Sequence, residues 1–101
     1  MKLLVLVVNS SVLQIVTDEL RLLGVAGFTV SHVEGHGAHT AEDRFLSARD
    51  RVVGFVPRVR IDIVLPAEQV GAVLDSLCAP DTGLGEHGTF WISAIDRFGQ
   101  L

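Results

Sequence analysis

Residues 58–65 alternate between charged and apolar side chains, and this period of two constrains the fold more than any other feature of the sequence. The apolar members are Val59, Ile61, Ile63 and Leu65, and the charged members are Arg58, Arg60 and Asp62. Successive side chains of a β-strand point to opposite faces of a sheet. The segment therefore predicts a strand with one face in the core and the other face wet or functional.

Three further segments are typical of strands, and two are typical of helices. The continuous apolar run 3–8 predicts a strand that is buried on both faces or lies at a subunit contact. Residues 28–33 and 89–95 are rich in β-branched and aromatic side chains and follow glycine-containing turns. Apolar residues recur with helical spacing in 12–23 and in 66–79, which predicts two amphipathic helices.

Individual residues mark the ends of these two helices. Ser10 or Ser11 is expected to cap the first helix, and Gly24 is expected to end it with a left-handed residue. Pro66 occupies the expected first position of the second helix. The single cysteine, Cys78, falls late in the apolar pattern of that helix and is expected to be a small buried hydrophobe.

The resulting order, βαββαβ, predicts a ferredoxin-like α+β fold, in which both helices cover one face of an antiparallel sheet. A chain of 101 residues suits one domain, residues 1–101. Residues 37–56 separate two strands that a short hairpin would be enough to join, and they carry charges of both signs. We interpret this long connection as a partner-binding loop, with a solvated insertion as the alternative.

Charge and hydropathy exclude several classes of partner. The net charge is −4 and there is no basic run, so nucleic acid is not expected as a partner. The longest apolar run, 3–8, is far shorter than the roughly 20 residues of a membrane span, so no direct membrane insertion is expected. Because this run is also too short for a secretory signal, we expect a cytoplasmic protein.

Four blocks of the sequence are similar to PII signalling proteins. Residues 19–30 and 33–37 resemble the first helix and second strand of that family, residues 55–66 resemble its third strand, and residues 82–88 resemble its nucleotide-binding B-loop. The resemblance implies a ferredoxin-like homotrimer that binds an adenine nucleotide in a cleft between each pair of subunits. It also implies that the long T-loop, here about 37–56, engages a target protein.

The resemblance further implies roles for individual residues. Val64 offers its main chain to adenine, Asp62 accepts a hydrogen bond from a ribose hydroxyl, and Val7 packs on the base. Thr29 and Gly27 contribute from across the subunit boundary. The full nucleotide set implied in this way is Val7, Gly27, Phe28, Thr29, Gly35, Gly37, Asp62, Ile63, Val64, Thr82, Gly83, Gly85, Glu86, His87, Gly88 and Thr89.

The chemistry of these residues suits such a ligand. Gly35 and Gly37 leave room for a ligand to approach the main chain, and the glycines of 82–88 can turn amide groups inward to form an anion-binding nest. The alternative is ordinary: Asp62 is a solvated strand residue, Thr29 a β-former and the glycines turn residues.

Two departures from the family bear on the choice of nucleotide. The main family grips the β and γ phosphates with a lysine that closes the B-loop and with two arginines of a C-terminal tail, whereas here Thr89 closes the loop and the sequence ends at Leu101. A charge-assisted contact to phosphate is worth on the order of 1.5–3 kcal/mol. We therefore expect AMP or ADP to bind at least as tightly as ATP.

The T-loop departs from the main family as well. The chain has no tyrosine to modify, and Arg49 and His39 replace a serine and a glutamine that are functional in relatives. What remains resembles the PII-like branch associated with bicarbonate uptake and carboxysomes, which implies a transporter or a carboxysome-related target. Bicarbonate is then a candidate second ligand, held by Arg58 or Arg60. Alternatively, these arginines solvate the outer face of their strand or pair with Asp62.

Two rival functions stay open from the sequence. His36, His39 and His87 can form a zinc or copper site if their loops meet, as in a trimeric metal-tolerance protein of the same fold, although no cysteine cluster supports them and no metal is expected. Catalysis is the other rival. No motif brings a nucleophile, a base and an orienting group together, so we do not expect an enzyme.

Overall fold

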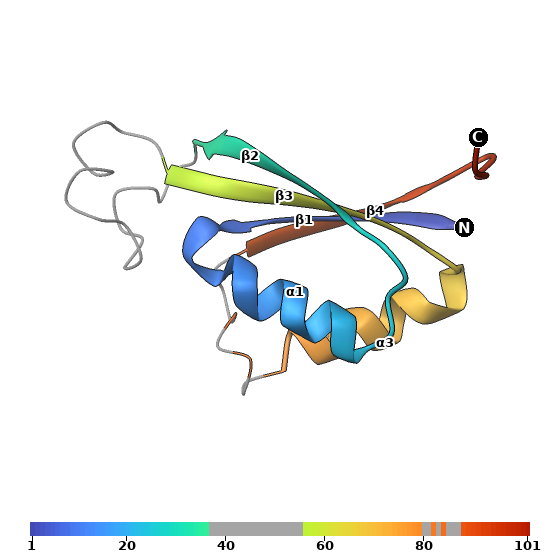
Figure 1. Ribbon diagram of the computed structural model, residues 1–101, viewed down its shortest axis with the longest axis horizontal. Helices are drawn as coiled ribbons and strands as arrows, with labels where there is room; N and C mark the ends of the chain where they lie inside the picture. Colours follow the sequence, from blue (N-terminus) through green and yellow to red (C-terminus); the bar gives the residue numbers. More distant parts are fainter. Residues whose placement is uncertain (37–55, 80–81, 83, 85–87) are drawn as a thin grey trace.

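The computed structural model describes residues 1–36, 56–79, 82, 84 and 88–101 (Figure 1). In chain order it forms β1 (Lys2–Asn9), the 3₁₀ turn η1 (Ser10–Val12), α1 (Leu13–Leu22), β2 (Thr29–Gly35), β3 (Val56–Leu65), α3 (Ala67–Leu77) and β4 (Gly88–Ala94). Every strand and helix predicted from the sequence is present, with ends that differ by a few residues. Val56, predicted as the end of the long loop, pairs instead with Gly35 as the first residue of β3.

The four strands form one antiparallel sheet in the order β2-β3-β1-β4. Figure 1 shows both helices on the same side of this sheet. This is the ferredoxin-like α+β arrangement that the sequence predicts. β1 lies between β3 and β4, and its residues Leu4, Leu6 and Val8 belong to the core under the helices, whereas Leu3 and Val7, on the opposite face, are only partly buried in the single chain.

The hydrophobic core lies between the sheet and the two helices. Val59, Ile61 and Ile63 of β3 are fully buried, which confirms the face assignment made from the alternation. The buried cluster comprises Leu4, Leu6, Val8, Val12, Val16, Leu20, Val59, Ile61, Ile63, Leu65, Val70, Val73, Leu77 and Leu84. Burial of one such side chain contributes roughly 1.5–3 kcal/mol, so this cluster holds the helices on the sheet.

The start of the first helix differs from the prediction. Neither Ser10 nor Ser11 caps it: the Asn9 side chain accepts a hydrogen bond from the Ser11 N–H at 2.9 Å, and both serines lie in the 3₁₀ turn. Val12, which precedes α1, makes no side-chain cap. Asn9 takes over because it is the last residue of β1 and the chain must turn directly after it.

The second helix also departs from the prediction at both ends. Pro66 is the residue before the helix, with ψ near 141°, rather than its first member. Cys78 was expected to be buried and is instead exposed. The helix ends at Leu77, so Cys78 follows the last turn and does not continue the buried stripe.

The end of α1 confirms the role assigned to Gly24. Its φ is +73°, and among the described residues no other has a left-handed backbone. The Val25 N–H donates to the Leu20 carbonyl at 3.0 Å and the Gly24 N–H donates to the Arg21 carbonyl at 3.1 Å. This pair of bonds is a Schellman motif, which needs the left-handed residue.

No helix in the described part of the chain is long and apolar enough to cross a membrane.

Two glycine substitutions should shift stability in opposite directions. Gly24→Ala should lower the free energy of unfolding by about 1 kcal/mol, because a Cβ atom is disfavoured in the left-handed region. Gly71→Ala, inside α3 and with nothing within 4 Å of the added atom, should raise it by about 0.5–1 kcal/mol through helix propensity. Urea unfolding measures both, and a shift in the same direction for the two variants would contradict the account of the helix end.

Candidate functional site

The sheet face away from the helices carries Thr29 and Ser31 of β2 and Arg60 and Asp62 of β3 in two rows that cross the sheet. We call this surface the open face. The first row is Thr29, Asp62, Val5 and Trp91, and the second is Ser31, Arg60, Val7 and Thr89. Five of the residues predicted for the nucleotide or the anion therefore lie in these two rows with Trp91: Val7, Thr29, Arg60, Asp62 and Thr89. The register brings these five together although they come from four different strands.

Arg60 connects β3 to β4 on the open face. Its Nη2 lies 3.0 Å from Oδ1 of Asp62, and its Nε donates to the same carboxylate at 3.1 Å. The guanidinium carbon also lies 5.5 Å from the centroid of the Trp91 ring, which places a cation over an aromatic face. Since β1 runs between β3 and β4, the Arg60 side chain reaches across β1, and Val5 is fully buried beside it.

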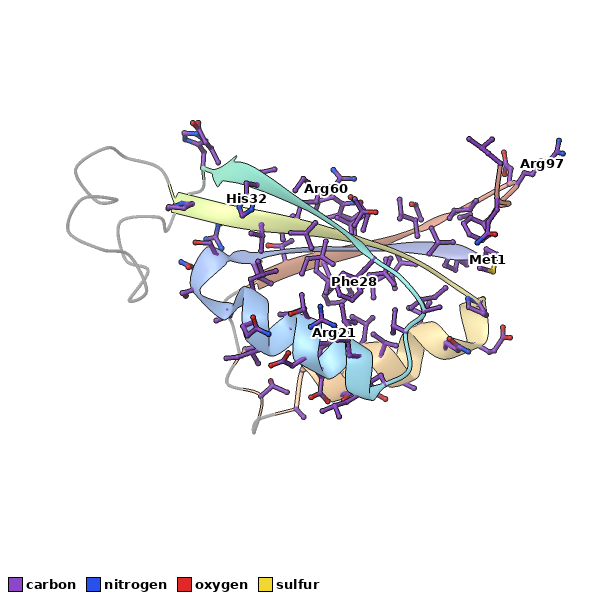
Figure 2. The ribbon with its side chains drawn as sticks, viewed as in Figure 1. Met1, Arg21, Phe28, His32, Arg60 and Arg97 are labelled. Atoms are coloured by element: carbon purple, nitrogen blue, oxygen red, sulfur yellow. The ribbon has the colours of Figure 1, made fainter. Side chains whose placement is uncertain are left out.

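This arrangement matches the alternative stated for Arg60 from the sequence, namely pairing with Asp62. Figure 2 shows Arg60 on the side of the sheet away from the helices. The Arg60 guanidinium donates to the Asp62 carboxylate and lies over the Trp91 ring. A ligand that binds Asp62 therefore meets a carboxylate that already accepts hydrogen bonds from Arg60. The sequence placed Trp91 only in the aromatic-rich segment 89–95. Its place in the row of Asp62, with Val5 of β1 between them, depends on the β1–β3 and β1–β4 registers.

At its C-terminal end, the main chain of β3 extends beyond the last residue that pairs with β2. The β2 pairing begins at Thr29 opposite Asp62, while β3 continues to Leu65. On the β2 side, residues 63–65 thus have no strand partner among the described residues. This edge is where the resemblance puts the adenine contact of Val64. The side chain of Ile63 is fully buried in the core, so only its main chain can reach a ligand.

Phe28 and Gly27 precede Thr29 at this edge. Phe28 is half-buried and packs against the core, with the Arg21 guanidinium 5.7 Å from its ring centroid on the helix side of the sheet (Figure 2). Its side chain is therefore turned away from the open face. Gly27 is exposed, and a Cβ atom placed on it would meet nothing within 4 Å. A substitution at Gly27 thus tests ligand approach without disturbing packing.

The glycine-rich loop is anchored at two described positions. The Thr82 hydroxyl lies 2.8 Å from the carbonyl oxygen of Ala79 and 2.9 Å from that of Leu77, which closes the end of α3, and it accepts from the Leu84 N–H at 3.3 Å. Leu84 is buried in the core. Leu84 was missed from the sequence because a lone leucine among glycines carries no periodic signal.

Gly88, the first residue of β4, follows the glycine-rich loop and precedes Thr89. A Cβ atom there would lie 2.8 Å from Cγ1 of Val8 and 3.3 Å from the Val7 carbonyl oxygen. Gly88 is therefore needed for β4 to pack beside β1, whatever the ligand. The remaining predicted positions, Gly37, His39, Gly83, Gly85, Glu86 and His87, lie outside the described residues.

The histidines that the structure describes do not form a metal site. The Nε2 atom of His36 lies 3.4 Å from Oε2 of Glu34. Both side chains are exposed, Glu34 near the end of β2 and His36 directly after it. Within the described residues no group of three or more potential ligands is present. His32 lies exposed on the edge strand β2.

The helix layer has a hollow of its own, away from the open face. Its lining is Ile15, Asp18, Glu19, Ser76, Ala79 and Thr82. The Ser76 hydroxyl donates to Glu19 at 2.7 Å, which ties α3 to α1. None of the open-face residues lines it, so we assign this hollow no part in the predicted site.

Over residues 1–100, the chain matches the family described as "Nitrogen regulatory protein P-II". The chain belongs to the P-II family. It is 28% identical over 98 residues to the nitrogen regulatory protein GlnK of Escherichia coli (strain K12), covering 96% of this chain and 88% of that protein. It is 26% identical over 98 residues to the nitrogen regulatory protein P-II of Rhizobium etli, with the same coverage of both chains.

The fold is similar to that of a solved structure as well. A DUF3240 family protein from Shewanella baltica OS155 matches with a TM-score of 0.76 and 23% identity, over 99% of this chain and 94% of that one. P-II proteins are regulatory signal transducers and not enzymes, which confirms the expectation of a non-enzymatic function. They are trimers that bind adenine nucleotides and regulate target proteins.

Replacement of Arg60 should change the fluorescence of Trp91, the single tryptophan of this P-II protein. Arg60→Gln removes both the ion pair with Asp62 and the contact with Trp91, so Trp91 emission should shift to longer wavelength. The free energy of unfolding should fall by about 0.5–1 kcal/mol, because these groups are partly exposed. Arg21→Gln breaks the corresponding contact with Phe28 and is the matched control. An equal emission shift in both variants would refute a direct Arg60–Trp91 contact.

Proposed function

We propose that this P-II family protein is a cytoplasmic homotrimer that binds an adenine nucleotide in each inter-subunit cleft and controls a target protein through residues 37–56. The observation that carries the proposal is the family match over residues 1–100. The open face supports it, because Thr29, Asp62 and Val7 lie within two adjacent rows and β3 offers main-chain groups beyond β2.

Exposed apolar surface supports association of subunits. Phe90, Trp91 and Ile92 of the edge strand β4 are between 42% and 49% exposed in the single chain. Three consecutive large apolar residues on an edge strand are unfavourable in water, and a neighbouring subunit removes them from it. The number three comes from the family and not from this surface.

The preference for AMP or ADP rests on Thr89. This neutral residue stands where the main family has a cation, and it lies opposite Val7 on the open face. A neutral side chain cannot make a charge-assisted contact to a β or γ phosphate. The additional phosphates of ATP therefore gain no such contact, and ATP should bind no more tightly than AMP or ADP.

The second ligand in this proposal is a small planar anion, bicarbonate, at the mouth of the cleft. Arg58 and Arg60 supply the nearby guanidinium groups on β3. By resemblance to the carboxysome-associated branch, the target is a transporter or a carboxysome-related protein.

Calorimetry with the three adenine nucleotides tests the preference. AMP and ADP should bind at least as tightly as ATP, and GMP should bind poorly because main-chain contacts at Val64 distinguish the adenine edge. ATP binding about tenfold tighter than ADP, equivalent to about 1.4 kcal/mol, would contradict the role of Thr89. Absence of binding for every nucleotide would overturn the proposed function.

A substitution at Gly27 tests the position of the site. Gly27→Ala should weaken AMP binding roughly tenfold, if a ligand approaches this main chain, and should leave the urea midpoint unchanged because the added Cβ meets nothing within 4 Å. Gly71→Ala, on α3, is the control and should keep the wild-type affinity. An unchanged AMP affinity in Gly27→Ala would remove this edge from the site.

A further inference from the structure

The hollow in the helix layer lies between α1 and the end of α3, and its walls are tied to one another. Its volume is about 500 Å³, which is enough for a side chain or a small ligand. The Ser76 hydroxyl donates to Glu19 at 2.7 Å, and the Thr82 hydroxyl lies 2.9 Å from the Leu77 carbonyl oxygen. These contacts fix the shape of the hollow in the free protein, so a partner would not have to form it.

The helices around the hollow are strongly acidic. α1 and α3 together contain four acidic residues and one basic residue, which are Asp18, Glu19, Glu68, Asp75 and Arg21. The two helices thus have a net charge of −3, against −4 for the whole chain. A surface with this imbalance attracts cations.

Glu19 is the acidic residue best placed to bind such a cation. It is half-buried and lines the hollow, and in the described part of the chain its carboxylate has the neutral Ser76 hydroxyl as its only donor. Arg21, the one cation of these helices, instead lies 3.5 Å from Asp18 and over the Phe28 ring. Glu19 therefore keeps acceptor capacity that an ammonium or guanidinium group can use.

Apolar side chains flank Glu19 along α1. Ile15 is 43% exposed and Leu22 is 82% exposed. They are seven residues apart, so they lie on the same face of the helix, about 10 Å apart along its axis. The order apolar, acidic, apolar complements a segment in which a basic residue stands between two apolar residues. A small free cation is too short to cover both Ile15 and Leu22.

The surfaces used by the proposed function lie elsewhere on the molecule. The candidate nucleotide residues are on the open face, and Figure 1 shows both helices on the other side of the sheet. The hollow is therefore free to contact a partner while a nucleotide is bound.

We propose that the hollow between α1 and α3 is a docking site for a basic amphipathic helix of a partner protein. One arginine or lysine of that helix enters the hollow and donates to the Glu19 carboxylate, and apolar residues on its neighbouring turns cover Ile15 and Leu22. The inference does not depend on nucleotide binding. It adds a second contact surface to the one proposed for residues 37–56.

The test is a titration of the ¹⁵N-labelled full chain, followed by NMR, with a helical peptide of about 15 residues made of alanine and glutamine. The peptide carries leucine at positions i and i+7 and arginine at i+4, which share one helix face. It should shift the amide resonances of the residues that line the hollow and bind with a Kd of about 1 mM or below. A peptide with glutamine in place of arginine should bind at least about fivefold more weakly.

Variants of the protein test the individual contacts. Glu19→Gln keeps an acceptor for Ser76 but removes the charge, and should weaken the arginine peptide at least about fivefold. In Glu19→Gln, the arginine and glutamine peptides should bind about equally. Leu22→Gln should weaken binding about threefold, because it removes apolar contact area.

Glu68→Gln is the matched control, because it removes the same charge from α3 at a residue that does not line the hollow. Glu68 lies roughly two helical turns before Ser76, so at physiological ionic strength its effect on the peptide should be less than about twofold. Equal weakening by Glu19→Gln and Glu68→Gln would show non-specific attraction to an acidic surface and would overturn the docking site.

Three other results contradict the inference. One is the absence of resonance shifts at the hollow at millimolar peptide. Another is binding of N-acetylarginine amide as tight as that of the peptide, which would make a free cation the ligand. The third is a set of shifts at the hollow that grow with protein concentration without peptide, which would make a second copy of the chain the occupant. Because the peptide arm uses the wild-type protein, it does not depend on the folding of any variant.

The outcome for nucleotide binding is separate. Glu19→Gln should keep the wild-type AMP affinity in calorimetry, because Glu19 lies on the helix side of the sheet. A wild type that binds the peptide but no adenine nucleotide overturns the proposed function alone. A wild type that binds AMP but not the peptide overturns the docking site alone.

Discussion

β1 and β3 pair along the whole of β1, from Lys2 opposite Leu65 to Asn9 opposite Arg58. This register places Val59, Ile61 and Ile63 under the helices. A slip of one residue would turn every side chain of β3 to the other face and bury the charges of Arg58 and Arg60 in the core. The cost of burying charges without partners locks the register, and the core and the open face both follow from it.

The open face is organised by the two arginines of β3 that remain outside the core. Arg60 bridges β1 and interacts with Asp62 and Trp91, whereas Arg58 lies over Gly35 on β2. Each direction depends on a residue of another strand, an aromatic ring in one case and the absence of a side chain in the other. A P-II protein with these two contacts presents its cations at different places on the same sheet.

The glycine-rich loop shows how a site is held by residues that do not touch a ligand. Thr82 closes the end of α3 and Leu84 is buried in the core, so the described positions at the start of the loop are tied to the scaffold. Gly88 allows the loop to return into β4 beside Val8. These anchors have no periodic signature, and a glycine-rich turn by itself does not distinguish a residue that binds from one that packs.

The sequence by itself determined the order of strands and helices, the buried face of β3, the left-handed end of α1 at Gly24 and the family, because hydrophobic period, glycine placement and block spacing are local properties of a chain. It did not determine that Asn9 replaces the serines as a cap, that Cys78 is exposed, or that Trp91 and Asp62 both contact Arg60. Only the tertiary structure decided these, since each depends on where a helix ends or which strands are neighbours. The register between strands brings together residues that are far apart in sequence. No local pattern encodes the direction in which a long side chain, such as that of Arg58 or Arg60, extends across the sheet.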